Sequence, residues 1–235
     1  ELKIQMSVHG MYNINKFTYD DLVIESKSES LSFNGLIVKS ISEHWSIGAY
    51  FTANSSTYSN IKYALNPAPA VEFNLFPYSE FTKRELRFLY RLGYKAVKYR
   101  EETIYEKTYE NLWGQSLSAI FEAKQKWGTL SVSLTGSHYF HDFSKNRLRF
   151  SADLSLRLIK SLRFNIDGSY SIVHDQLSLP RMGASLEEIL LRRSELETTY
   201  NYFFSVGISY TFGSIRSKVV NPRFGDGGRG IHISF

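Results

Sequence analysis

Hydrophobic and polar positions alternate with a period of two along most of this chain. The clearest example is 204–212, whose apolar positions are Phe204, Val206, Ile208, Tyr210 and Phe212. This period predicts β-strands, because successive side chains of a strand point to opposite faces of the sheet. Segments with the same pattern lie near 2–13, 30–41, 45–54, 63–77, 86–97, 113–124, 128–140, 148–158 and 162–167. The pattern therefore predicts an all-β protein of about ten antiparallel strands.

The lengths of the connections distinguish two kinds of β-fold. Short turns are predicted at 42–44, 124–126 and 160–161, and longer polar segments at 14–29, 98–111 and 174–200. Short turns at one end and long loops at the other are typical of outer-membrane β-barrels, whose apolar face contacts lipid. A soluble β-sandwich, with its apolar face packed inside, shows the same alternation and is the alternative. Trp45 and Trp127 favour the barrel, since each begins a strand after a short turn, where an aromatic girdle belongs.

The composition agrees with a barrel and not with membrane helices. Apolar residues are 43% of the chain and charged residues 22%, and no apolar run approaches the roughly 18 residues of a spanning helix. The 16 Tyr, 17 Phe and 3 Trp fit aromatic girdles at two interfaces. The absence of cysteine excludes disulfides and cysteine-based sites. The net charge of +5 is spread over strands and turns, so we expect no nucleic-acid partner.

Charged residues gather on the polar face of the predicted strands, which would be the lumen of a barrel. They are Glu72, Arg87, Arg91, Lys95, Glu122, Arg149, Asp153, Arg157, Arg163 and Asp167. Charges of both signs on one face cost little only where they pair or meet water. We expect opposite charges on neighbouring strands to pair, with Glu72 beside the basic row on 86–97. The interpretation is a lumen largely filled by charged side chains, with little or no stable conductance.

Two His-Asp pairs are the candidates for chemistry. His141 with Asp142 and His174 with Asp175 fall at the predicted extracellular strand ends, and His138, Ser137, Ser144 and Ser171 are near them in sequence. An imidazole beside a carboxylate can bind a metal or orient a general base. The alternative is a polar rim that simply meets water, and the spacing matches no metal or triad signature. We therefore predict no catalytic, cofactor-binding or metal-binding residues, no cofactor and no enzyme activity.

The longest predicted loop contains a short helix at 185–197. Ser185 and Glu188 form a capping box, and Glu187 and Glu188 lie at the positive end of the helix dipole. Leu186, Ile189 and Leu190 share one face. This face either packs over the mouth of the barrel as a lid or binds another outer-membrane or surface protein.

Four stretches of the chain resemble a known family. They are APAVEFNLFPY at 68–78, GSHYFHDFS at 136–144, YTFGSI at 210–215 and VVNPRF at 219–224. In these stretches the chain resembles an uncharacterised family of Bacteroidetes-type outer-membrane β-barrel proteins. The resemblance implies a fold and a location, the bacterial outer membrane, but no functional residues. Members of that family carry further sequence before the position of Glu1, so the resemblance implies 10 to 12 strands.

The sequence therefore predicts a transmembrane antiparallel up-and-down β-barrel at 1–213 and a C-terminal tail at 214–235. Its leading functional hypothesis is a structural or interaction component of an envelope complex, embedded in the lipid bilayer. A passive channel for small solutes is the first alternative, and a lipid-modifying enzyme that uses His141 and His174 is the second.

Overall fold

The computed structural model describes residues 2–19, 22–159, 161–181 and 198–210. Its strands form a single 10-stranded sheet in chain order. They are β1 (Leu2–Tyr19), β2 (Leu22–Ser40), β3 (Trp45–Ser56), β4 (Ile61–Asn74), β5 (Arg84–Tyr99), β6 (Tyr109–Gln125), β7 (Gly128–Tyr139), β8 (Asn146–Ile159), β9 (Leu162–Val173) and β10 (Tyr200–Tyr210). One 3-10 helix, η1 (Tyr78–Glu80), lies between β4 and β5. The predicted all-β, antiparallel, up-and-down arrangement is confirmed.

The hairpin of β1 and β2 is longer than the sequence pattern predicts. The predicted polar loop at 14–29 is wrong, because the two strands stay paired from Leu2 opposite Lys39 to Tyr19 opposite Leu22. This stretch contains several residues with high β-propensity, among them Ile14, Val23 and Ile24.

The predicted asymmetry of the connections is also weaker than expected. The connection 75–83, which contains η1, lies at the same end of the sheet as the turns 126–127 and 160–161.

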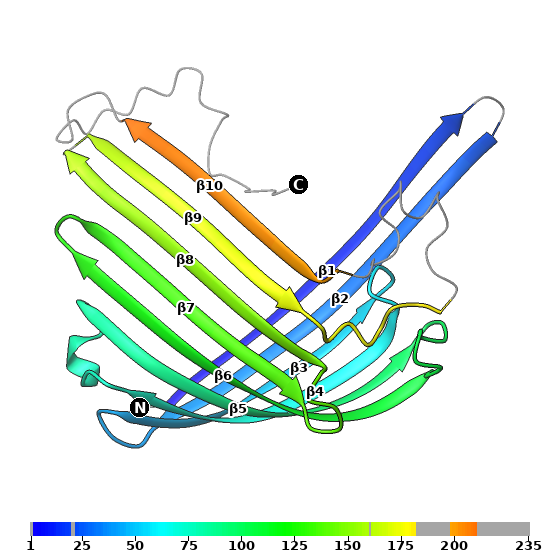
Figure 1. Ribbon diagram of the computed structural model, residues 1–235, viewed down its shortest axis with the longest axis horizontal. Helices are drawn as coiled ribbons and strands as arrows, with labels where there is room; N and C mark the ends of the chain where they lie inside the picture. Colours follow the sequence, from blue (N-terminus) through cyan, green and yellow to red (C-terminus); the bar gives the residue numbers. More distant parts are fainter. Residues whose placement is uncertain (1, 20–21, 160, 182–197, 211–235) are drawn as a thin grey trace.

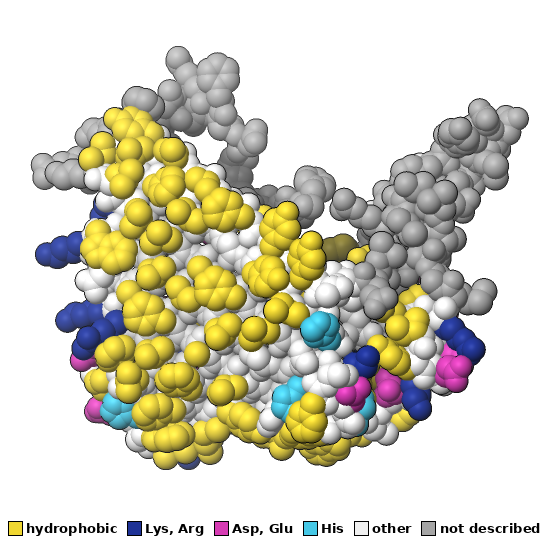
Figure 2. Space-filling model, viewed as in Figure 1, with side chains coloured by type: hydrophobic (Ala, Val, Ile, Leu, Met, Phe, Trp, Pro, Cys, Tyr) yellow, Lys and Arg dark blue, Asp and Glu magenta, His cyan; other side chains and the backbone are white. Residues whose placement is uncertain are grey.

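The two faces of the sheet have opposite chemistry. We call the apolar face the outer face; it includes Ile47, Phe88, Phe150, Val206 and Ile208. We call the opposite, polar face the inner face. Outer side chains are widely exposed, with 50% of Val206 and 72% of Ile208 accessible. Figure 2 shows hydrophobic side chains spread over the outer face of β6 to β10, with charged side chains mostly near the strand ends. The apolar set is therefore not packed inside the described part of the chain.

Aromatic side chains flank both ends of the outer face. At the end with the 126–127 and 160–161 turns, Trp45 packs on Phe73 with ring centroids 4.8 Å apart, and Trp127 is 47% exposed. At the opposite end, Tyr94 packs on Trp113 at 4.9 Å. Rings that are apolar on one side and carry a polar atom are favoured where a membrane meets water. Trp45 begins β3 as predicted, whereas Trp127 lies within the 126–127 turn, one residue before β7.

The sheet is strongly curved, with β4 to β6 at the bottom of the curve and β1–β2 and β9–β10 as its rising arms (Figure 1). The inner face lies on the hollow side, since the Arg91 guanidinium on β5 reaches across β4 to within 5.3 Å of the Tyr50 ring centroid on β3. In the described residues β1 pairs only with β2 and β10 only with β9, so the two outermost strands are not joined to each other. A β-sandwich is excluded for this part of the chain, because its strands form one sheet.

No helix among the described residues is long and apolar enough to cross a membrane. The predicted helix at 185–197 and the predicted tail at 214–235 lie outside the described residues.

Candidate functional site

The middle of the inner face carries small hydroxyl side chains. Ser118 on β6 lies opposite Thr135 on β7, and their hydroxyl oxygens are 2.9 Å apart. Ser133 on β7 lies opposite Ser151 on β8, with oxygens 2.7 Å apart. Cross-strand hydroxyl pairs of this kind support the register and present a polar surface without a fixed charge. The inner face is therefore wettable, and its small side chains leave space above the sheet.

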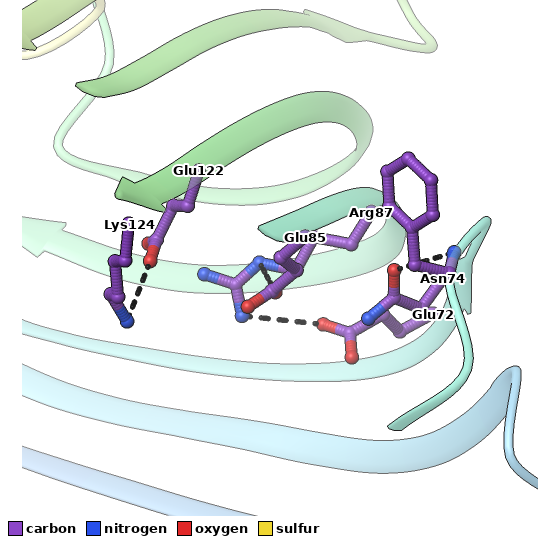
Figure 3. Close-up of polar contacts among 7 residues, drawn as sticks. Glu72, Asn74, Glu85, Arg87, Glu122 and Lys124 are labelled. Carbon is purple, nitrogen blue, oxygen red and sulfur yellow. Dashed lines mark hydrogen bonds and ion pairs between the residues drawn. The ribbon is translucent and has the colours of Figure 1, made fainter. Parts of the chain in front are cut away.

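A cluster of ion pairs lies on the inner face of β4 to β6 (Figure 3). Arg87 Nη1 is 3.7 Å from Glu72 Oε2, and Arg87 Nε is 2.9 Å from Glu85 Oε1. Lys124 Nζ is 3.4 Å from Glu122 Oε2. The prediction that Glu72 lies beside the basic row of β5 is confirmed. Since the Glu72, Glu85 and Arg87 side chains are only partly exposed, their attraction is screened less than that of a fully exposed pair.

Strands β8 and β9 show the opposite arrangement, with like charges facing each other. Arg157 lies directly opposite Arg163, and Asp153 directly opposite Asp167. The predicted lateral pairing of opposite charges is therefore wrong for these strands. The charges recur every four residues on both strands, and the register of the two strands from Arg147 to Arg157 aligns equal signs. Like charges directly opposite are destabilising unless water or counter-ions surround them.

The register also collects carboxylates into one line across five strands. Glu85 lies opposite Glu122, Glu122 opposite Ser131, Ser131 opposite Asp153, and Asp153 opposite Asp167. We call Glu85, Glu122, Asp153 and Asp167 the acidic row. The acidic row lies toward the end with the 126–127 and 160–161 turns, and Lys124, Arg157 and Arg163 lie between it and those turns.

The opposite end of the inner face is covered by the chain after β9. We call residues 174–181 the strap; in Figure 1 it runs from β9 toward the ends of β4 and β5. Leu177 is 5% exposed and belongs to a hydrophobic cluster with residues from β4, β5 and β6. The other members of that cluster are Ile61, Ala64, Val97, Tyr99 and Leu112. In the described residues this apolar core is on the inner face, where the strap buries it.

Polar contacts fix the strap on both sides. Asn60 Nδ2 donates a hydrogen bond of 3.0 Å to the carbonyl oxygen of Ser178. Arg181 Nη1 lies 3.1 Å from Glu102 Oε2 in the loop between β5 and β6. The strap therefore narrows the hollow of the sheet at this end. Sequence reasoning placed a lid at 185–197 and missed the strap, although the alternating apolar residues Leu177 and Leu179 in a polar loop were a usable signal.

The two His-Asp pairs lie near each other but make separate contacts. Asp142 accepts hydrogen bonds from the Ser144 hydroxyl, at 2.7 Å, and from the Ser144 backbone N–H, and these hold the pKa of Asp142 below its ordinary value. Asp175 pairs with Arg147, and His174 Nδ1 is 3.2 Å from Asn146 Oδ1.

The remaining residues considered for chemistry are spread over both faces and the rim. His138 Nε2 is 2.7 Å from Gln115 Nε2, and the His141 ring lies against that of Tyr139. Ser137 lies opposite Arg147 on the inner face, and Ser171 is buried. Within the described ranges no hydrogen bond joins a histidine to an aspartate, and no three His, Asp or Glu residues gather with the geometry of a metal site. The structure thus assembles neither a triad nor a ligand set from these residues in the part of the chain that it describes.

Replacing either rim histidine is expected to leave the protein folded and functional. The change is His141→Ala or His174→Ala, and the reason is that His141 contacts the Tyr139 ring and His174 contacts Asn146, both at the rim and neither in a catalytic or metal-binding arrangement. Heat-resistant gel migration measures folding, and the in vivo phenotype measures function. Loss of function with retained folding in either variant would contradict this, and metal analysis of the purified protein would then separate a metal site from an enzyme.

Comparison with solved structures gives one similarity. The chain is similar to a NanC porin structure in a rhombohedral crystal form, with a TM-score of 0.44 and 10% sequence identity. The similarity covers 90% of this chain and 98% of that chain. No protein-family model and no curated protein matches the chain.

Proposed function

We propose that this protein spans the bacterial outer membrane as the wall of a β-barrel. The observation that carries the proposal is the separation of the two faces: the apolar outer face is exposed over the whole sheet, and the inner face is polar. In water such a large exposed apolar face would favour aggregation, whereas in a membrane it would contact lipid. The aromatic pairs at both ends of the outer face give the membrane-facing band its two borders.

Closure of the barrel follows from the same proposal. Within the described residues, one edge of β1 and one edge of β10 are unpaired. A bilayer offers no water to the backbone N–H and C=O groups at such edges, so they must be paired in the membrane. We expect β1 and β10 to pair with each other, because they run antiparallel and carry matching faces. On β1 the outer positions include Ile4 and Met6, and on β10 they include Val206 and Ile208.

In place of the filled, non-conducting lumen that the sequence predicts, we further propose that the inner face borders a hydrated passage for small solutes. Arg157 opposite Arg163 and Asp153 opposite Asp167 support this, since like charges at this spacing need water between them. The acidic row, which brings carboxylates of four strands into one line, also resembles the rings of acidic side chains that line cation-conducting pores. The strap makes the passage narrow at the end with the long loops.

Planar-bilayer recording tests the passage. The intact protein is expected to give small, steady currents. The double variant Asp153→Asn, Asp167→Asn should shift the permeability ratio toward anions by about twofold, because it removes two negative charges from the acidic row. Asp142→Asn is the matched control, since this carboxylate lies in the turn between β7 and β8 and outside the passage. Absence of current after removal of contaminating porins, or an equal shift in both variants, would contradict the proposal.

The interaction role is the second candidate, and it is favoured by the edges of β1 and β10, which are unpaired within the described residues. A partner that contributes a strand would satisfy these edges as well as closure does. Its predicted binding segment at 185–197 lies outside the described residues. Pull-down from detergent with mass spectrometry tests it, because a stoichiometric partner supports an envelope complex and its absence weakens that role.

A further inference from the structure

A cavity of about 270 Å³ lies on the inner face beside the strap. Its lining includes Arg91 and Lys95 of β5, Ser116 of β6, Ser137 of β7 and Asp175 of the strap. The space exists partly because Gly93, between the two basic residues, has no side chain. A Cβ built there would approach no closer than 3.5 Å to its nearest neighbour, Asn66 Oδ1, which is an ordinary contact distance.

Arg91 is the distinctive group of this cavity. Its Nε lies 3.2 Å from Ser116 Oγ, and its guanidinium faces the Tyr50 ring. Its two terminal nitrogens make no hydrogen bond within the described part of the chain. A guanidinium carries N–H donors in a planar fork that matches a carboxylate with two parallel hydrogen bonds. The free side of the fork is thus available to a ligand in the cavity.

The other half-buried arginines in the described ranges are neutralised by carboxylates. Arg87 lies 2.9 Å from Glu85, and Arg147 lies 2.8 Å from Asp175. Asp175 is the carboxylate in the lining of the cavity, and it is held by Arg147. Arg91 has no carboxylate partner of this kind in the described residues, and a half-buried cation without one favours an anion from solution.

We propose that this cavity binds a small organic carboxylate. The terminal nitrogens of Arg91 would donate two parallel hydrogen bonds to it, and the hydroxyls of Ser116 and Ser137 would contact it. The cavity is smaller than the roughly 300 to 1,000 Å³ of sites for drug-sized ligands, so the ligand has only a few carbon atoms. The inference deepens the proposed function, because it names the solute class that the passage would bind. The carboxylate site requires only the folded sheet and strap, so it can be tested without a measurement of conductance.

Isothermal titration calorimetry of the detergent-folded protein tests the site, with succinate as the probe at constant ionic strength. We expect saturable binding with a Kd of the order of 1 mM. Arg91→Gln should weaken binding about tenfold, because it removes the fork and the charge. Gly93→Val should weaken it to a similar degree by filling the cavity while it keeps every charge. The matched control is Arg163→Gln, which removes an exposed arginine of the same face on β9 and should leave the Kd unchanged.

Several outcomes would overturn the site. They are no saturable heat with the wild-type protein, equal weakening in Arg91→Gln and Arg163→Gln, and tighter binding of sulfate than of succinate, which would indicate a tetrahedral oxyanion. Heat-resistant gel migration of each variant verifies folding, and the sulfate comparison uses the wild-type protein alone. Succinate binding without bilayer current would contradict the passage and support the carboxylate site. Bilayer current without succinate binding would support the passage and contradict the site.

Discussion

Val206→Arg is expected to prevent insertion of most of the protein into the outer membrane. Val206 lies in the middle of β10 on the outer face, between Phe204 and Ile208, and all three side chains are at least half exposed. An arginine facing lipid near the bilayer midplane costs about 2 to 4 kcal/mol. That cost is a large part of the few kcal/mol that stabilise a typical fold. Membrane fractionation and heat-resistant gel migration measure the loss.

Ser205→Arg is the matched control for this change. Ser205 is the preceding residue of β10, lies on the inner face and is directly opposite Asp167. The new guanidinium would meet a carboxylate and water rather than lipid, so insertion should be close to normal. If both variants inserted equally well, the outer face of β10 would not contact lipid. If both failed equally, β10 would not tolerate a long side chain on either face.

Leu177→Ala is expected to release the strap and raise the bilayer conductance by roughly threefold or more. Leu177 is buried against β4 to β6, and truncation of a buried leucine costs about 2 to 5 kcal/mol. This cost falls on the strap alone, because β4 to β6 remain paired with each other, so the displaced strap should become more populated. Hydrogen exchange gives a second readout, because the Ile104 backbone N–H donates to the Leu179 carbonyl at 2.9 Å and should lose its protection.

Leu158→Ala is the control for the strap. It is the same truncation on β8, at an outer-face position that is 57% exposed. Conductance and exchange at Ile104 should both stay at their wild-type values. Faster exchange without a higher conductance would show that the strap moves but does not limit the passage. Unchanged exchange in Leu177→Ala would show that Leu177 does not hold the strap.

The sequence by itself determined the strands and their two faces. A period of two leaves no freedom in which side chains share a face, so the apolar set around Val206 and the polar set around Asp153 followed from the pattern alone. The partner of Glu72 could also be predicted, because consecutive strands of an up-and-down sheet are neighbours and this places β4 next to β5. Sequence pattern did not reveal that β1 and β2 continue through 14–29, since polar residues there resemble a loop as much as a strand exposed to water.

Only the tertiary structure decided which charges meet. Arg157 faces Arg163 and not Asp167 because of the register of β8 and β9, and a four-residue shift would have placed Arg157 opposite Asp167 without changing either face. The strap and the Arg91 cavity have the same origin. They join β3 to β7 with a segment far along the chain, and a local pattern carries no information on contacts of such long separation.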